Sequence, residues 1–412
     1  MAVSEGPLSG IVVADFSRVL AGPYATMLLA DLGAEVIKVE GPAGDDTRGW
    51  VPPRRDDVGT YYLAVNRNKR SIALDLKDAD DLSVAHALSA RADVFIQNFK
   101  PGGLARFGLD YEAVRGRNER TIYCSISGFG AEGGAKLPGY DLLVQGMSGL
   151  MSLTGSPDGP PFRAGISVFD VMTGLQSVIG ILAALHHRDE TGEGQHIETN
   201  LLSTALSTLV NQTSAYVAGG VVPTRMGNAH LSLFPYEPLQ TGDGELIVVA
   251  GNNGQFRRLA EVLGHPEWAD DPRFDTIGRR NENREELRPL LLEALSAKSA
   301  QDWFAILTEA GLPCGPINTV QGGVELAERL GLQPVVEVGG VPTVRNPIGF
   351  SLTPPTYRSA PPALDQHGAE IRHWLATGAA GHPGAAPAAP ATAATAATAA
   401  TGATNGTEAG RD

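Results

Sequence analysis

Short apolar runs alternate with amphipathic stretches through the first 130 residues of the chain. The runs are rich in β-branched residues, as buried strands are. Five of them predict strands, at residues 11–14, 35–39, 71–76, 93–96 and 121–126. Apolar residues at helical spacing predict helices at 23–32 and 82–91. Strands that alternate with helices are typical of a parallel sheet with right-handed crossovers, so the pattern predicts an α/β fold.

Asp170 stands between two further apolar stretches. Residues 166–169 predict a strand, and residues 171–185 carry apolar side chains at helical spacing. An Asp that precedes an apolar periodic run is most often an N-cap. Helix N-termini also favour negative charge, so the same carboxylate can stay ionised in apolar surroundings and act as a nucleophile. Position alone favours the cap, and both interpretations stay open.

The pattern changes in the second half of the chain. A strand at 195–199 and a long helix at 201–217 are followed by a loop-rich stretch, and then by the elements of a smaller unit. That unit has a predicted strand at 246–250 and predicted helices at 255–263, 284–295 and 300–310. We therefore predict four parts: a large domain from 1–224, a small domain from 225–325, a return segment from 326–376 that completes the large domain, and a disordered tail rich in Ala, Thr, Pro and Gly from 377–412.

Composition narrows the function classes. The formal charge of −14 and the pI near 5.1 argue against binding nucleic acid or an anionic membrane. No apolar stretch approaches the roughly 20 residues of a membrane span, and the first residues lack the pattern of a signal peptide. Cys124 and Cys314 have no spacing typical of a metal site or a disulfide framework. We expect a cytoplasmic protein.

Residues 11–40 have the outline of a dinucleotide-binding unit, with a strand, a turn, a helix and a second strand that ends in an acid. The turn from Asp15 to Tyr24 lacks G-x-G-x-x-G, however, and only Gly22 is suitably placed. We therefore reject NAD(P) as the main ligand and keep the Rossmann-like topology. No metal-binding motif is present either, so we expect no metal site.

A series of ordered motifs, which together cover all of the chain except its tail, resembles the family III CoA-transferases of the CaiB/BaiF type. The motifs are residues 8–23, 31–40, 66–77, 98–102, 127–130, 139–141, 188–195 and 311–318. This resemblance implies that Asp170 is the catalytic nucleophile, which forms an acyl anhydride and then an aspartyl-CoA thioester. Each intermediate keeps the activation of the donor thioester, so acyl-CoA is a substrate and no permanently bound cofactor is expected. Both intermediates hydrolyse readily, and the site must therefore exclude water.

The resemblance also places the CoA contacts. They are expected at Leu20, Ala21, Leu74, Asp75, Lys77, Asn98, Phe99, Lys100, Arg106, Leu137 and Tyr140. The three cations in this set would supply the phosphate charge that an acidic chain otherwise lacks, although each taken alone is more often a solvated surface residue. Gly41 stands where formyl-CoA transferase has an arginine, and Arg67, Lys69 and Arg70 lie close by in the sequence. None of the three is assigned.

Two rival functions are weighed against transfer. The related α-methylacyl-CoA racemases need paired acid and base groups, including a His where this chain has Tyr140 and a Glu where it has residues 251–254. The second rival is a catalytically idle CoA-binding subunit. Retention of Asp170 in its full context favours transfer over both.

Four stretches look most like the succinate–hydroxymethylglutarate branch of the family, namely residues 200–203, 225–230, 235–236 and 251–256. Succinyl-CoA is therefore the expected donor and a carboxylic acid the acceptor, with Arg225, Gly227 and His230 as candidate substrate contacts. The resemblance further implies a Rossmann-like large domain with an inserted small domain, in an interlocked homodimer.

Overall fold

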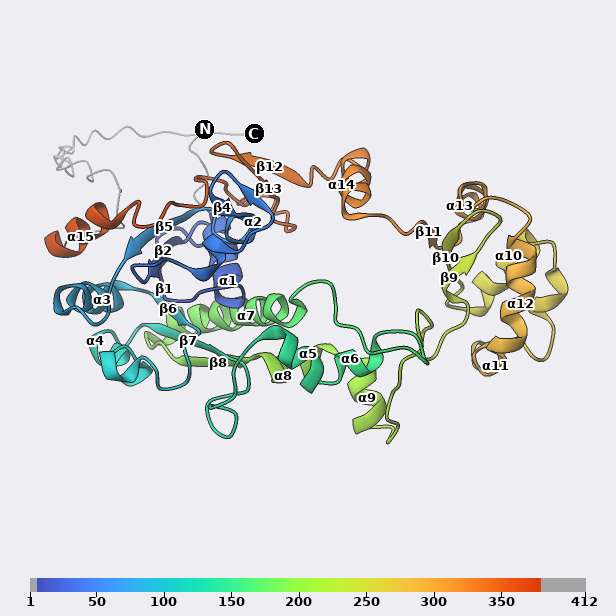
Figure 1. The fold of residues 1–412 in the computed structure, drawn as a ribbon, viewed down its shortest axis with the longest axis horizontal. Helices are drawn as coiled ribbons and strands as arrows, with labels where there is room; N and C mark the ends of the chain where they lie inside the picture. The colour runs from blue at the N-terminus through green and yellow to red at the C-terminus, as the bar shows by residue number, and fades with distance from the viewer. Residues whose placement is uncertain (1–5, 379–412) are drawn as a thin grey trace, which may run out of the picture.

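A six-stranded parallel sheet forms the centre of the larger part of the molecule in the computed structural model, which describes residues 6–378 (Figure 1). The strand order is β5-β2-β1-β6-β7-β8, and every neighbouring pair is parallel. The strands are β1 (Val12–Asp15), β2 (Glu35–Glu40), β5 (Lys69–Ala73), β6 (Val94–Gln97), β7 (Ile122–Ser127) and β8 (His196–Asn200). Numbered within the sheet this order is 3-2-1-4-5-6, which is that of the Rossmann fold, so the predicted α/β class is confirmed.

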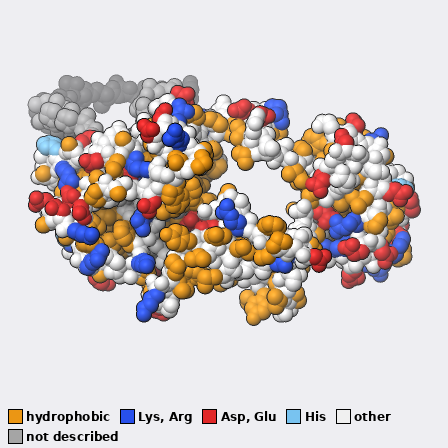
Figure 2. All heavy atoms as spheres, viewed as in Figure 1, with side chains coloured by type: hydrophobic (Ala, Val, Ile, Leu, Met, Phe, Trp, Pro, Cys, Tyr) orange, Lys and Arg blue, Asp and Glu red, His pale blue; other side chains and the backbone are white. Residues whose placement is uncertain are grey.

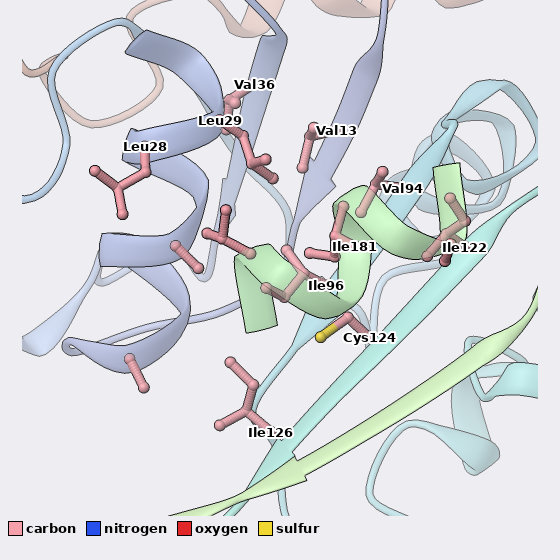
Figure 3. Packing of buried hydrophobic residues seen from close by; sticks show 14 of the residues in the cluster. Val13, Leu28, Leu29, Val36, Val94, Ile96, Ile122, Cys124, Ile126 and Ile181 are labelled. Atoms are coloured by element: carbon pink, nitrogen blue, oxygen red, sulfur yellow. The ribbon is translucent and has the colours of Figure 1, made fainter. Parts of the chain in front are cut away.

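Helices α1 (Ala21–Asp31) and α7 (Val168–Thr191) cover one face of this sheet. Figure 3 shows Leu29 of α1 and Ile181 of α7 directed toward Val13, Val94 and other strand residues. A Cβ atom at Gly174 of α7 would lie 2.7 Å from the Ala21 carbonyl oxygen of α1. Only glycine permits this approach, and the two helices therefore pack with their backbones close together.

The other face of the sheet is covered by α3 (Ala79–Arg91), α4 (Tyr111–Arg117) and α15 (Gly368–Thr377). Ile371 and Trp374 of α15 are buried in the same core as Phe95 and Tyr123 of the sheet. The end of the described chain thus packs against strands formed near its beginning. The predicted tail lies outside the described residues, except for Thr377, which ends α15, and Gly378.

Shorter elements connect the strands at the rim of the sheet. They are η1 (Asp46–Gly49), β3 (Arg54–Arg55), β4 (Val58–Gly59), α2 (Thr60–Ala64), η2 (Ala105–Phe107), α5 (Asp141–Met147), α6 (Leu150–Leu153), α8 (Leu201–Thr208) and α9 (Asn211–Val217). The single helix predicted at 201–217 is wrong, because α8 ends before Val210, where the backbone turns to a φ of 41°.

A smaller lobe, from β9 to β11, has its own core of buried residues between Phe234 and Leu312. Its elements are β9 (Tyr236–Gln240), β10 (Glu245–Val249), α10 (Asn253–Val262), η3 (Pro266–Ala269), α11 (Ile277–Glu282), α12 (Arg284–Leu295), α13 (Ala300–Glu309) and β11 (Cys314–Gly315). The chain then returns to the larger part through α14 (Val320–Arg329), β12 (Val335–Val338) and β13 (Val341–Val344). Figures 1 and 2 show an opening between the two lobes, bordered by the two stretches of chain that connect them.

Two predictions about the start of α7 are wrong. Residues 166–169 do not form a strand, because the helix already begins at Val168, and Asp170 is its third residue instead of its N-cap.

By length and composition α7 is also long and apolar enough to cross a membrane, with a mean hydropathy of 1.8 in its most apolar stretch. Buried residues such as Val178 and Ile181 pack in the core beneath the sheet, and this accounts for much of its apolar character.

Candidate active site

Asp170 lies at the edge of the sheet where the parallel strands end. Helix α7 leads into the start of β8, so it runs antiparallel to the strands and begins at their carboxyl edge. Helix α1 begins at the same edge, directly after β1. Open α/β sheets bind their ligands along this edge. The fold therefore places the candidate nucleophile where a ligand is expected.

Asp141 caps α7 from a distant part of the chain. Its Oδ2 accepts hydrogen bonds from the backbone N–H groups of Phe169, at 2.8 Å, and of Asp170, at 3.1 Å. These two groups would otherwise be among the unpaired donors of the first helical turn. Ser167 occupies the N-cap position and makes no side-chain cap bond. The acid that caps the helix is therefore Asp141, and the side chain of Asp170 is left available.

Gln145 fixes the segment that leads to Asp170. This fully buried side chain donates to an Asp141 carboxylate oxygen and to the Ile166 carbonyl oxygen at 3.1 Å. Its own amide oxygen accepts from the Ala164 N–H at 2.8 Å. Because Asp141 and Gln145 are one turn apart on α5, this short helix positions both the loop at 164–166 and the first turn of α7.

Burial, and after it the nearby negative charge of Asp141, raise the pKa of Asp170 to about 7. Among residues 6–378 no Lys, Arg or His forms an ion pair with Asp170. The expectation that this carboxylate is simply held ionised by the helix N-terminus therefore needs correction. It is a carboxylate with no cationic partner, and its ionised form is kept high in energy, which makes it reactive.

Tyr61 and Trp50 form a wall beside this acid. The Tyr61 hydroxyl lies next to Ser167, and its pKa is raised by burial and by the charges of Asp170 and Asp141. The Trp50 ring meets the Tyr61 ring edge-on, with 5.2 Å between centroids. The two aromatic residues line an open hollow of about 620 Å³ together with Val51, Pro52 and other residues between Gly49 and Ala64.

Sequence reasoning missed Asp141, Gln145, Tyr61 and Trp50. Asp141 belongs to the motif at residues 139–141, but nothing in that motif indicates that it caps a helix beginning 27 residues later in the chain. The aromatic pair had only a weak signal, as two aromatic residues on either side of a stretch that contains Pro52 and Pro53.

The predicted CoA contacts follow the ends of three strands. Leu20 and Ala21 are buried at the start of α1, after β1, and Leu74 and Asp75 follow β5. Asn98 follows β6, and its side chain accepts from the Arg18 N–H at 3.0 Å and donates to the Arg18 carbonyl at 2.7 Å. These contacts connect the turns after β1 and β6. The structure thus brings these positions to one edge of the sheet.

The basic residues near this edge fall into two groups. Lys77, Lys100 and Arg106 are exposed, and within residues 6–378 none of them is engaged in an ion pair. Arg67 and Lys69 are buried and paired with Asp31 and Asp15, while Arg70 pairs with Glu35 and Glu370. The second group is therefore committed to the fold, and the first is free to meet phosphate.

A second hollow of about 410 Å³ lies at the ends of β6, β7 and β8. Phe99 and Lys100, two of the predicted CoA contacts, belong to its lining, as do Ser125 and His196. Leu137 and Tyr140 lie in the long segment after β7 and are exposed, Tyr140 by 66%. Tyr140 directly precedes the capping acid Asp141.

The candidate substrate contacts are divided between two places. Gly227 donates to the Gly155 carbonyl at 3.0 Å, and Arg225 donates to the Ser156 carbonyl at 3.3 Å, so both contact the segment that leads to Asp170. The His230 ring instead lies 5.1 Å from the Tyr236 ring of the small lobe. Two of the three thus contact the loop after α6, 14 and 15 residues before Asp170, and the third lies at the small lobe.

Within residues 6–378, no group of three or more His, Cys, Asp or Glu side chains is arranged to hold a metal ion. The arrangement around Asp170 has a different chemistry. It combines a partly buried carboxylate that has no ion-pair partner among residues 6–378, an aromatic pair, and a group of exposed cations on the same rim. Such a set can attack an electrophilic carbonyl and hold an anionic, phosphate-bearing ligand nearby.

Comparison with known proteins indicates a family whose chemistry fits this site. The profile of CoA-transferase family III matches residues 8–368. The succinate–glutarate CoA-transferase of Agrobacterium fabrum is 44% identical over 391 residues, which span 90% of this chain and 96% of that protein. The human succinyl-CoA:glutarate CoA-transferase is 40% identical over 372 residues, with 89% of this chain and 85% of that protein covered. The crystal structure of a CaiB/BaiF family protein from Brucella suis is 44% identical and superposes with a TM-score of 0.81, covering 90% of this chain and all of that one.

Proposed function

This chain belongs to CoA-transferase family III and is a CoA-transferase, and from that premise we propose that it moves CoA from succinyl-CoA to a dicarboxylic acid through covalent intermediates on Asp170. The observation that carries the proposal is the unpaired, partly buried Asp170 carboxylate at the carboxyl edge of the sheet, with its pKa raised to about 7.

The proposed reaction begins with attack of an Asp170 oxygen on the thioester carbon of the donor. The tetrahedral adduct expels CoA thiolate and leaves a mixed anhydride between the succinyl group and Asp170. The thiolate then attacks the aspartyl carbonyl carbon, which releases succinate and leaves an aspartyl-CoA thioester. No net proton is taken up or lost, and the bond energy of the donor thioester is retained.

The acceptor completes the cycle by the reverse sequence. Its carboxylate attacks the aspartyl thioester and expels the thiolate, and the thiolate then attacks the acceptor carbonyl of the new anhydride. The new acyl-CoA forms and Asp170 returns to its carboxylate form. Because every step exchanges one activated acyl bond for another, the chemistry needs no resident metal or cofactor.

Residues of this chain support each requirement of the proposal. Tyr61 lies near Asp170 and packs against Trp50, so a bound acyl-CoA that covers these two rings would keep water from the anhydride. Lys77, Lys100 and Arg106 are exposed at the same rim and are suited to the phosphates of CoA. Arg225, whose guanidinium donates to the Ser156 carbonyl, is a candidate partner for the distal carboxylate of a dicarboxylate.

Glutarate is the first acceptor to test, because the relatives that are 40 to 44% identical are named for it. Other relatives are named for mesaconate and oxalate, which are also dicarboxylates. The racemase alternative is disfavoured by the loop at 251–254, where Asn252 caps α10 by accepting from the Gln255 N–H at 2.9 Å. A helix cap at this place offers no acid or base to the substrate.

A homodimer forms part of the proposal. Apolar side chains are exposed along α5, α7, α8 and α9, among them Met147, Ile179 and Val217 at 59%, 60% and 74%. Patches of this kind are typical of subunit interfaces. We propose that residues 1–224 and 326–376 act as one domain and 225–325 as a second, and that two such rings interlock through the opening seen in Figure 2.

The deciding experiment mixes the protein with succinyl-CoA and examines the peptide that holds Asp170 by mass spectrometry, with and without hydroxylamine. A hydroxylamine-sensitive succinyl or CoA adduct on that peptide is expected, with transfer to glutarate. Asp170→Asn should lower the transfer rate by roughly 1000-fold or more, because the nucleophile is lost.

Asp189→Asn is the matched control, since Asp189 lies on the same helix with its side chain 71% exposed. It should retain activity within a factor of about two. An Asp170→Asn variant that still transfers CoA at a tenth of the normal rate would contradict the covalent mechanism. Binding of CoA without thiol release by the unchanged protein would instead favour the idle subunit.

A further inference from the structure

Val19 has a strained backbone in the turn between β1 and α1. Its φ is 71°, in the left-handed region. A β-branched residue rarely adopts this conformation, because its Cβ substituents crowd the backbone, whereas glycine adopts it freely. Strain of this kind persists only where the surrounding structure holds it in place, and it is concentrated at functional sites.

Asp45 holds this conformation. The two oxygens of its carboxylate accept from the Val19 N–H at 3.2 and 3.4 Å. One of them also accepts from the backbone N–H and the hydroxyl of Thr47, at 3.0 and 2.7 Å. The carboxylate is therefore fixed in position by its own loop while it binds the strained residue.

Lys38 holds Asp45 in turn. Its ammonium group donates to an Asp45 oxygen at 2.9 Å and to the Ser17 carbonyl at 3.2 Å. The Lys38 side chain is fully buried, and that of Asp45 is 1% exposed. Burial alone would raise the pKa of Asp45, but the charge of Lys38 and the hydrogen bonds from Lys38 and Thr47 together outweigh it and hold this pKa at about 2. The Asp45 carboxylate is therefore ionised at neutral pH, and its ion pair with Lys38 joins two points of the same turn.

Other side chains hold the rest of the turn. Asn98 binds both backbone groups of Arg18, and Lys69 donates to the Pro23 carbonyl at 2.9 Å. Backbone groups between Ser17 and Pro23 are thus bound by side chains from β2, β5, the loop after β2 and the loop after β6. The turn has its shape before any ligand arrives.

The position of this turn determines where α1 begins relative to the nucleophile. Leu20 and Ala21 follow Val19 directly, and α1 has no side-chain cap at its start. The Ala21 carbonyl lies against Gly174, one helical turn after Asp170 on α7. The charges of Asp45 and Asp170 both raise the pKa of the Tyr61 hydroxyl, so both acids are near enough to act on the same side chain.

We propose that Asp45, supported by Lys38, is a positioning residue for CoA transfer, which keeps Val19 in the left-handed conformation so that Leu20 and Ala21 meet the CoA thioester beside Asp170. This inference rests on the proposed function, because it takes CoA as the ligand at the start of α1. It assigns Asp45 no contact with the substrate.

The test measures CoA affinity by titration calorimetry, which needs no turnover, in Asp45→Asn and Asp45→Glu. Asp45→Asn replaces one of the two accepting oxygens with an amide nitrogen that cannot accept, and Asp45→Glu displaces the carboxylate by one methylene. In either variant Val19 should keep the left-handed conformation only roughly a tenth of the time, and the apparent dissociation constant of CoA should rise about tenfold. The KM for succinyl-CoA should rise with it, while kcat changes less than about threefold. Asp45→Glu keeps a negative charge beside Lys38 and tests the same point should Asp45→Asn fail to fold.

A second substitution separates positioning from a general structural role. In a Val19→Gly background the left-handed conformation carries no penalty, so replacing Asp45 should raise the CoA dissociation constant less than about threefold relative to Val19→Gly alone. Arg18→Gly is the matched control. It adds a glycine at the neighbouring residue, whose φ is not in the left-handed region, and the tenfold loss should persist in that background.

The outcomes distinguish the two proposals. Rescue by glycine at position 19 and not at 18 supports the inference. Unchanged CoA affinity in both Asp45 variants, or equal rescue by the two glycines, overturns it. Tight CoA binding with no thiol release by the unchanged protein overturns the proposed function alone, whereas absence of CoA binding overturns both.

Discussion

Asp45 and Asp170 are both carboxylates held at the carboxyl edge of the large sheet, but they have different partners. Asp45 faces Lys38 and three further hydrogen-bond donors, and its pKa is held at about 2. Asp170 faces the acid Asp141 and no cation among the described residues, and its pKa rises to about 7. Burial acts in the same direction on both, so the partner decides the difference. A buried acid with a cation is part of the scaffold, and one without a cation is available for chemistry.

Removing the cation beside Asp45 should have the largest effect, because it turns Asp45 into a buried acid without a cation. Lys38→Met leaves the Asp45 carboxylate buried and unpaired, and the free energy of unfolding should fall by about 3–5 kcal/mol. Urea denaturation followed by circular dichroism measures this loss. The double variant Lys38→Met, Asp45→Asn should recover part of it, because no unpaired charge remains. A single variant as stable as the unchanged protein would show that the pair adds nothing to the scaffold.

Lowering the pH should reduce the stability of the fold within a definite pH range. The folded pKa of Asp45, about 2, is below the unfolded value of 3.8, so its contribution is present above pH 4 and is lost as the pH falls toward 2. The loss from this residue is about 2 kcal/mol. The free energy of unfolding, measured by urea denaturation, should therefore fall less between pH 6 and pH 2 for Asp45→Asn than for the unchanged protein. An equal fall in the free energy of unfolding for the two proteins would contradict the assigned role of Lys38.

The smallest effect concerns the pH profile at Asp170. The attacking form is the carboxylate, so the rate of the first half-reaction should rise as the pH increases through about 7 and then level off. Asp141→Asn removes a negative charge nearby, which should move the midpoint down by up to about one pH unit. Stopped-flow thiol release at several pH values measures it. A midpoint that stays in place would mean that burial alone sets the pKa.

Prediction from sequence succeeded where local pattern governs structure. The strands at the centre of the sheet were predicted to within two residues, since buried parallel strands have continuous apolar runs that are easy to recognise. The start of α7 was placed wrongly, because Ile166 to Phe169 is as apolar as a strand. The cap that begins the helix, Asp141, lies 29 residues before Asp170. The break near Val210 has no glycine or proline to mark it.

The sequence by itself determined the α/β class, the position of Asp170 at the start of an apolar helix, and the motifs that indicate the family. These depend on spacing along the chain and on residue types, which short-range physics already constrains. Only the tertiary structure decided which buried acids have a cation, which basic residues stay free, and that Val19 is strained. Those properties depend on contacts between strands and loops far apart in sequence, and the charge environment of a carboxylate exists only once the fold has brought its neighbours together.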